Sequence, residues 1–324
     1  MRHHYWEWPI ASYLFLGGLG GGIYFLAMVF GFFVLPGFSM EVFAWAGFIS
    51  LVCLAFGCFL LVFELGQPGV FYRAFIKSTS IICWGARLLS VCLIFGFFWW
   101  LSYLPWGWAA GIAGFFTFFR GFNLLLAGIS GFGIMVYTGL MFSTLKSHAF
   151  WATPALPVLF TTSALSTACA AITLCLGFTG FWTADNIMLN YVLAEYIHEL
   201  LHMVDIILVI AEITILLLYV LSLVGAGNVA AKQVADRWVK GKTAPLFWGV
   251  MVGLGLVLPL IIYITSPNAV IAPVIILLSG LLLRFLFVYS DDRRDIPGEI
   301  PFYTKLPSKD AAFLHAFPKG QNLY

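Results

Sequence analysis

The chain has 324 residues, of which 62% are hydrophobic and only 9% are charged, against roughly 25% charged in an average soluble protein. Its 16 Lys and Arg and 14 Asp and Glu residues are too few to cover a globule of this size with polar groups, which excludes a water-soluble domain. The net charge of +2 gives no support for a nucleic-acid partner. Lipid is therefore expected to cover most of the surface.

Eight apolar runs are each long enough to cross a bilayer, which needs roughly 20 residues. In chain order they are 9–35, 42–65, 81–103, 119–144, 156–180, 189–225, 245–266 and 269–289. The first run is too long for a signal-peptide core and has no evident cleavage site, so it is predicted to stay as a span. The sixth is longer than a bilayer requires, and its first third, 189–203, is predicted to be an exposed or interfacial extension. The expected fold is an all-α bundle of eight transmembrane helices over residues 1–289.

Lys and Arg gather on one side of this topology, the side that holds both termini and the predicted loops near 66–80, 146–155 and 226–244. The basic residues there are Arg73, Lys77, Lys146, Lys232, Arg237, Lys240, Lys242, Arg293, Arg294, Lys305, Lys309 and Lys319. The opposite loops, which contain no Lys or Arg, are 36–41, 104–118, 181–188 and 266–268. The positive-inside rule therefore predicts a protein of the inner (cytoplasmic) membrane with cytoplasmic termini. Residues 290–324 are polar and contain several prolines, and we expect them to form an extramembrane tail that contacts a partner subunit.

Cysteine and glycine residues lie inside the apolar runs. The six cysteines contain no CxxC pair, so they are predicted to be small core residues, and any iron–sulfur centre is expected in another subunit. The glycine-rich stretch 17–22 is not preceded by a strand, which argues against a nucleotide-binding loop. Close packing of helices is the expected role of these glycines.

Charged residues inside spans are costly, so they are either paired or functional. Glu64, Arg87 and Arg284 come from three spans at a similar depth, near Tyr137 of a fourth and near Tyr13. One interpretation is an ion pair of Glu64 with Arg87 or Arg284 that locks helix packing. The alternative is a ligand pocket on the side of the basic loops.

A second polar series follows the sixth span. It consists of Glu195, His198, Glu199, His202, Asp205 and Glu212. At 100° per residue these positions share an arc of about 140° on one helix. One interpretation is a proton path, in which the strongest candidates are His202, Asp205 and Glu212. The other is a solvated helix face, which we prefer for the outer residues Glu195, His198 and Glu199. His198 and His202 share one helical face, so bis-histidine haem is not expected.

Several motifs in order along the chain resemble the NrfD/PsrC membrane subunits of respiratory oxidoreductases. They are Trp6-Glu7-Trp8-Pro9-Ile10-Ala11-Ser12-Tyr13, Glu64-Leu65-Gly66-Gln67-Pro68, Trp84-Gly85, Tyr137-Thr138-Gly139, Trp151-Ala152-Thr153-Pro154 and Arg284. In this family the second motif usually reads Asp-Leu-Gly-Arg-Pro. The resemblance covers about residues 5–290, and metals and haem are not expected in this subunit.

The resemblance implies that the protein exchanges electrons between a quinone pool, of menaquinone or ubiquinone, and an attached iron–sulfur subunit. That partner is expected to be a four-cluster ferredoxin-like protein connected to a molybdopterin-type catalytic subunit. Of three polar quinone contacts in the polysulfide reductase anchor, an Asn, a His and a Tyr, the first two positions hold Ile10 and Tyr13 here, while Tyr137 matches the third. The resemblance also places the motif side at the periplasm, opposite to the orientation that the charges favour.

The expected site has two kinds of residue. The quinone-binding residues are predicted to be Trp8, Tyr13, Gly18, Arg87, Tyr137 and Arg284. Glu64 and Tyr137 are the candidate catalytic groups, with Glu64 able to accept a proton from quinol. The alternative function is a secondary transporter or proton-translocating bundle, although no repeat relates the two halves of the chain. A mixed function, an anchor that also moves protons, remains open.

Overall fold

The computed structural model describes residues 8–37, 40–64, 81–103, 110–145, 148, 150–177, 187–225, 229–266 and 270–290. Over these residues every regular element is a helix, and eight helical segments are long and apolar enough to cross a membrane. The predicted all-α bundle of eight spans is therefore confirmed. The side chain of Glu64 and the tail after Ser290 lie outside the described residues.

The eight spans follow one another in chain order. The first four are α1 (Trp8–Val29), which continues as the π-helix η1 (Phe30–Val34), α2 (Ala44–Glu64) after the 3-10 turn η2 (Met40–Phe43), α4 (Ile81–Leu101) and α6 (Arg120–Ser143). The last four are α7 (Ala155–Leu176), α8 (Ile187–Gly225), the π-helix η6 (Pro245–Val257) with α10 (Leu258–Thr265), and α11 (Ile271–Val288). At 39 residues, α8 is about 58 Å long at 1.5 Å per residue, well beyond the hydrocarbon thickness of about 30 Å.

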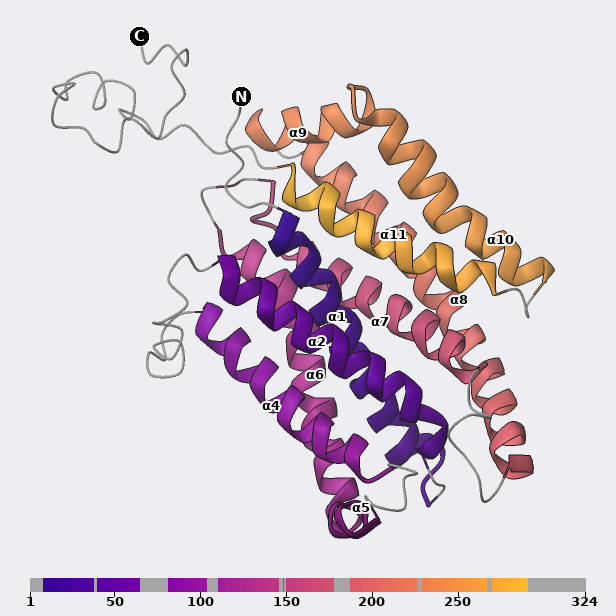
Figure 1. Cartoon of the computed structure of the whole chain (residues 1–324). Coiled ribbons are helices and arrows are strands. Elements are labelled where there is room, and N and C mark those ends of the chain that lie inside the picture. The colour runs from indigo at the N-terminus through magenta and orange to yellow at the C-terminus, as the bar shows by residue number, and fades with distance from the viewer. Residues whose placement is uncertain are drawn as a thin grey trace, which may run out of the picture.

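Helix α1 lies at the centre of the bundle and joins its two halves (Figure 1). On one side it contacts α2 and α6, with α4 packed behind them, and we call these three helices the first half of the bundle. On the other side it contacts α7 and α11, which belong to the second half. Helices α8 and α10 complete the second half through contacts with α7 and α11. Because α1 is covered on both sides, it has almost no lipid-facing surface and shows no apolar stripe.

Glycines in α1 bring the helix backbones close together. A Cβ at Gly21 would lie 2.7 Å from the carbonyl oxygen of Gly131 in α6, and a Cβ at Gly22 would lie 2.7 Å from Cβ of Ala168 in α7. On α2, the hydroxyl of Ser50 donates a hydrogen bond of 2.7 Å to the Gly20 carbonyl. These contacts confirm that the glycine-rich stretch serves helix packing, because no larger side chain fits between the backbones.

Two segments expected to be loops contain short helices. These are α5 (Ala110–Phe118) and α9 (Val229–Val239), at opposite ends of the bundle (Figure 1). Helix α9 is amphipathic, with Val234 and Trp238 buried and Lys232 exposed. The Trp238 indole donates a hydrogen bond of 2.8 Å to the Ser290 hydroxyl. The prediction of a loop over 226–244 was wrong for residues 229–239, which form α9. The charged residues of this segment lower its average hydrophobicity, and its short apolar face is recognisable only where it packs against the bundle.

Candidate functional site

Two buried phenols meet between the helices of the first half. Tyr13 of α1 is 1% exposed and Tyr137 of α6 is 4% exposed, and the two side chains are close enough to interact electrostatically. The Tyr137 hydroxyl donates to the Met141 sulfur at 3.3 Å, whereas the Tyr13 hydroxyl faces Tyr137 but makes no hydrogen bond of normal length and angle with a described residue. A buried hydroxyl without a good partner is costly. Tyr13 therefore presents a weakly held donor inside the bundle.

Glycines make the space for this pair. Gly85 of α4 faces the Tyr137 ring so closely that any Cβ there would overlap it, and a Cβ at Gly57 of α2 would lie 3.5 Å from the Tyr13 ring. Gly85 belongs to the motif Trp84-Gly85, and Gly57 lies two helical turns before the motif that begins at Glu64. Helices α1, α2, α4 and α6 thus enclose the two phenols together.

Three other predicted site residues, Trp8, Arg87 and Glu64, make no contact with this pair that the structure describes. Trp8, at the start of α1, is 53% exposed. Arg87 is half-buried on α4, with its guanidinium carbon 5.4 Å from the centre of the Trp84 ring on the same helix. Glu64 is the last residue of α2, but the position of its carboxylate relative to the phenols lies outside what the structure describes.

Arg284 lies on the other side of α1 and is 1% exposed. Its guanidinium donates to the Ser163 hydroxyl at 2.5 Å and to the Phe160 carbonyl at 3.0 Å, both on α7. Its Nε atom has no hydrogen-bond partner among the described residues. A Cβ at Gly18 would lie 3.9 Å from this guanidinium. The residues expected to form one pocket are thus divided: Tyr13 faces α2 and α6, while Gly18 faces α7 and Arg284.

A buried carboxylate accompanies Arg284. Glu212 of α8 is 2% exposed and interacts electrostatically with Arg284 and with the Ser163 hydroxyl that lies beside both. One Glu212 oxygen has no hydrogen-bond partner within the described ranges. Two buried opposite charges bridged by a hydroxyl form a coupled group in which removal of either partner leaves a buried charge.

Two turns away on α8, Asp205 forms a second buried polar group. It is 1% exposed and accepts hydrogen bonds from the Ser166 hydroxyl of α7 at 2.6 Å and from the Tyr263 hydroxyl of α10 at 2.8 Å. The Nε2 atom of His202 lies 3.2 Å from the Tyr263 carbonyl oxygen. Tyr263 and Ser166 were not among the residues predicted from the sequence. Ser163 and Ser166 are one helical turn apart in an apolar run, and this spacing could have indicated a polar face on α7.

The polar groups of α8 face into the bundle. The rings of His198 and His202 are stacked with centroids 6.5 Å apart, and Asp205 follows at the next turn. On the opposite face of the helix, Met203 and Ile207 are 62% and 66% exposed, which is expected of a surface that contacts lipid. Nearer the start of α8, Glu195 and Glu199 are exposed.

These side chains can bind and move protons and can donate hydrogen bonds to a ligand. Carboxyl, imidazole, phenol and hydroxyl groups run from His198 through Asp205 and Glu212 to Arg284. Within the described ranges, no group of three or more His, Cys, Asp or Glu residues could hold a metal ion. All six cysteines are free thiols.

Comparison with known proteins identifies the family. A family model described as "Polysulphide reductase, NrfD" matches residues 1–290. The C subunit of the polysulfide reductase of Wolinella succinogenes is 26% identical over 313 residues, which cover 88% of this chain and 93% of that protein. Protein NrfD of Escherichia coli K12 is 25% identical over 314 residues, covering 88% of this chain and 94% of the relative. The protein therefore belongs to the NrfD family of multi-pass membrane proteins.

Proposed function

We propose that this protein is the membrane anchor subunit of a respiratory oxidoreductase and exchanges electrons between a quinone pool and an attached iron–sulfur subunit. The family match and the relative named as one part of a polysulfide reductase support an anchor that works within a larger complex. The observation that carries the quinone proposal is the buried hydroxyl of Tyr13, which lies beside Tyr137 and makes no hydrogen bond of normal length and angle with a described residue. Menaquinone and ubiquinone fit this donor equally well.

The residues of the pair have separate tasks in this proposal. A quinone takes up two electrons and two protons on reduction, and its two carbonyl oxygens need hydrogen-bond donors. Tyr13 donates to one carbonyl, which gives its hydroxyl the well-formed hydrogen bond that it lacks among the described residues. Tyr137 borders the ring, and Glu64, at the end of α2, exchanges one of the two protons with a quinone oxygen. The other proton exchanges with water at the same membrane interface, and the two electrons pass between the quinone and the attached iron–sulfur subunit. The half-buried Arg87 contributes positive charge near this end of α4.

Replacing Tyr13 by Phe removes this donor and keeps the ring. We expect the quinone-linked kcat/KM of the purified complex to fall about 10-fold to 100-fold, the effect of one lost hydrogen bond in a buried site. Tyr137→Phe and Glu64→Gln are also expected to slow turnover, with subunit content unchanged. Tyr24→Phe is the matched control, because Tyr24 is buried on the same helix but donates to the Gly47 carbonyl. Normal quinone turnover in all three site variants would show that the pocket is elsewhere.

The proposed partners are a four-cluster ferredoxin-like iron–sulfur subunit and a molybdopterin-type catalytic subunit. A docking surface is available at the end of the bundle that carries α9, where Lys232, Lys240 and Lys242 are exposed. We place this end and both termini in the cytoplasm on the charge distribution. Co-purification with an iron–sulfur subunit supports the anchor, whereas uptake of a solute by the isolated protein in liposomes would favour the transporter alternative.

The second proposed function is proton movement through the polar series of α8. The observation that favours it is Asp205, a carboxylate 1% exposed that is held by Ser166 and Tyr263 beside His202. Glu212 lies two turns farther along the same helix, or about 10 Å, and has an oxygen without a described partner. The Ser166 hydroxyl of α7 lies beside Asp205 and the Ser163 hydroxyl of α7 lies beside Glu212. Side chains from α7 and α8 therefore line the space between the two carboxylates.

Replacing Asp205 by Asn keeps the size of the side chain and removes its ability to carry a proton. If protons cross by this route, we expect proton uptake per quinone turned over in vesicles to fall by about half or more, because an amide cannot pass a proton along a relay of ionisable groups. Glu199→Gln is the control, because Glu199 lies on the same helix but is exposed. An unchanged proton-to-quinone ratio in Asp205→Asn would contradict the path.

A further inference from the structure

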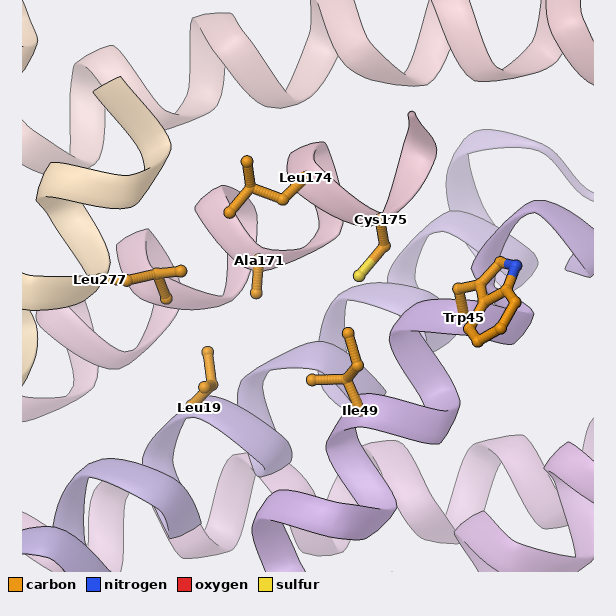
Figure 2. A pocket seen from close by; sticks show the side chains of 7 residues that line it. All are labelled: Leu19, Trp45, Ile49, Ala171, Leu174, Cys175 and Leu277. Carbon is orange, nitrogen blue, oxygen red and sulfur yellow. The ribbon is translucent and has the colours of Figure 1, made fainter. Parts of the chain in front are cut away.

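A cavity of about 160 Å³ lies between α1, α2, α7 and α11, and its lining is entirely apolar. Figure 2 shows the side chains of Leu19, Ile49, Ala171 and Cys175 turned toward one another, with Leu277 at one end. None of these residues belongs to the phenol pair or to the Arg284 group. An apolar cavity of this size stays free of water and takes up an apolar ligand.

The cavity extends from one membrane interface toward the centre of the bundle. Trp45, in the first turn of α2, and Cys175, in the last turn of α7, mark the end opposite α9. Ala171 lies one turn deeper on α7, and Leu19 lies near the middle of α1. This is the depth range of an acyl chain in one leaflet, and Trp is the residue expected at the level where such a chain meets its head group.

The wall of the cavity reaches the lipid-facing surface. Ile49 is 38% exposed, whereas Leu19, Ala171 and Cys175 are each at most 5% exposed. The cavity is therefore open to the apolar surface of the bundle beside Ile49, where molecules dissolved in the bilayer have access. The close contact of Gly20 with Leu54 and Ser50 closes the path between α1 and α2, so the tail of a quinone bound at Tyr13 does not reach the cavity by that route.

The charged residues at the end of the bundle opposite α9 distinguish between anionic and zwitterionic lipids. Among the described residues, the cation nearest this membrane face is Arg120, at the start of α6. Its guanidinium is held by Ser102 at 3.0 Å and lies 4.1 Å from the centre of the Tyr103 ring. The described part of the cavity rim thus offers no cation to an anionic head group.

We propose that the cavity binds a segment of one acyl chain of a zwitterionic phospholipid from the leaflet opposite α9. The acyl chain fills the gap between α2 of the first half and α7 and α11 of the second, so the lipid packs the two halves of the bundle against each other. This proposal does not depend on the quinone function.

Photolabelling tests the occupant. The complex is reconstituted in nanodiscs that contain phosphatidylcholine with a diazirine in the middle of one acyl chain, and labelled peptides are identified by mass spectrometry. We expect labelling of the segment around Ala171 and Cys175, with a decrease of fivefold or more in Ala171→Leu, which fills the cavity. Ala55→Leu is the matched control, because Ala55 is exposed on α2 and its replacement leaves the cavity open.

Three outcomes would overturn the proposal. Labelling equal in Ala171→Leu and wild type would mean that the acyl chain lies outside the cavity. Labelling lost on addition of a long-tail quinone would assign the cavity to the isoprenoid tail. Labelling several-fold stronger with an anionic phosphatidylglycerol probe would contradict a zwitterionic lipid. Since Ala171→Leu can alter folding, Cys175→Met, which narrows the same cavity one turn away, is the second variant. It should lower labelling in the same way, and unchanged labelling in a folded Cys175→Met protein would equally overturn the proposal.

Discussion

Replacing Gly21 by Ala is expected to destabilise the protein strongly, because the added methyl group meets the backbone of a neighbouring helix and not a movable side chain. The new Cβ would lie 2.7 Å from the Gly131 carbonyl oxygen and 3.2 Å from its Cα. Both are backbone atoms, so relief requires α1 and α6 to move apart. We expect a loss of about 3 kcal/mol, at the upper end of the usual cost of overpacking, measured as a fall in the melting temperature of the detergent-solubilised complex.

Gly131→Ala is expected to behave in the same way because the contact is reciprocal. Gly249→Ala is the control, since Gly249 lies in η6 and a methyl group added there would have no neighbouring atom within 4 Å among the described residues. It should be neutral or slightly stabilising, as Ala favours a helix over Gly by up to about 1 kcal/mol. Because Tyr13 and Tyr137 lie on the two helices that would separate, quinone turnover should fall together with stability. A Gly21→Ala protein with wild-type melting would show that the backbones are farther apart than described.

Removal of Arg284 is the second large expected effect. Arg284→Leu breaks the hydrogen bonds to Ser163 and Phe160 and leaves Glu212 as a buried carboxylate without its nearby positive charge. Breaking a buried pair by removing one partner costs about 3–5 kcal/mol. We expect a loss of this size in chemical or thermal unfolding of the purified complex.

The double variant Arg284→Leu with Glu212→Gln separates charge from packing. Because it removes both charges, it should recover at least half of the stability lost in the single variant. Glu199→Gln is the control, since Glu199 is exposed on the same helix as Glu212 and its replacement should change stability by less than about 0.5 kcal/mol. A double variant no more stable than Arg284→Leu would mean that Glu212 and Arg284 are not energetically coupled.

The polar stripe of α8 shows how far the sequence alone reaches into the site. Helical periodicity places His202, Asp205 and Glu212 on one face, and the exposed apolar residues Met203 and Ile207 lie on the opposite face. The partners of Asp205 were not predictable in this way. Tyr263 is 58 residues away and Ser166 is 39 residues away in the sequence, and nothing local determines which faces of α7 and α10 turn toward α8.

Tertiary packing also decided which of the predicted site residues lie together. Depth in the membrane follows from position along each span, so the sequence places Tyr13, Gly18 and Arg284 at comparable levels. Rotation about the axis of α1 separates them: Tyr13 faces α2 and α6, whereas Gly18 faces α7 and Arg284. Two residues five positions apart on a helix project in different directions, and only the packed bundle shows which neighbour each one meets.

The sequence by itself determined the number, length and order of the membrane helices, because crossing a bilayer requires apolar runs that satisfy their own backbone hydrogen bonds. It also predicted close packing at the glycines of α1, since small residues in an apolar span serve few other purposes. The tertiary structure alone decided that Asp205 bonds to Ser166 and Tyr263, that Arg284 is held by α7, and that α9 buries Trp238. The physical reason is that these contacts depend on the rotation and spacing of helices from distant parts of the sequence, which hydrophobicity and periodicity do not specify.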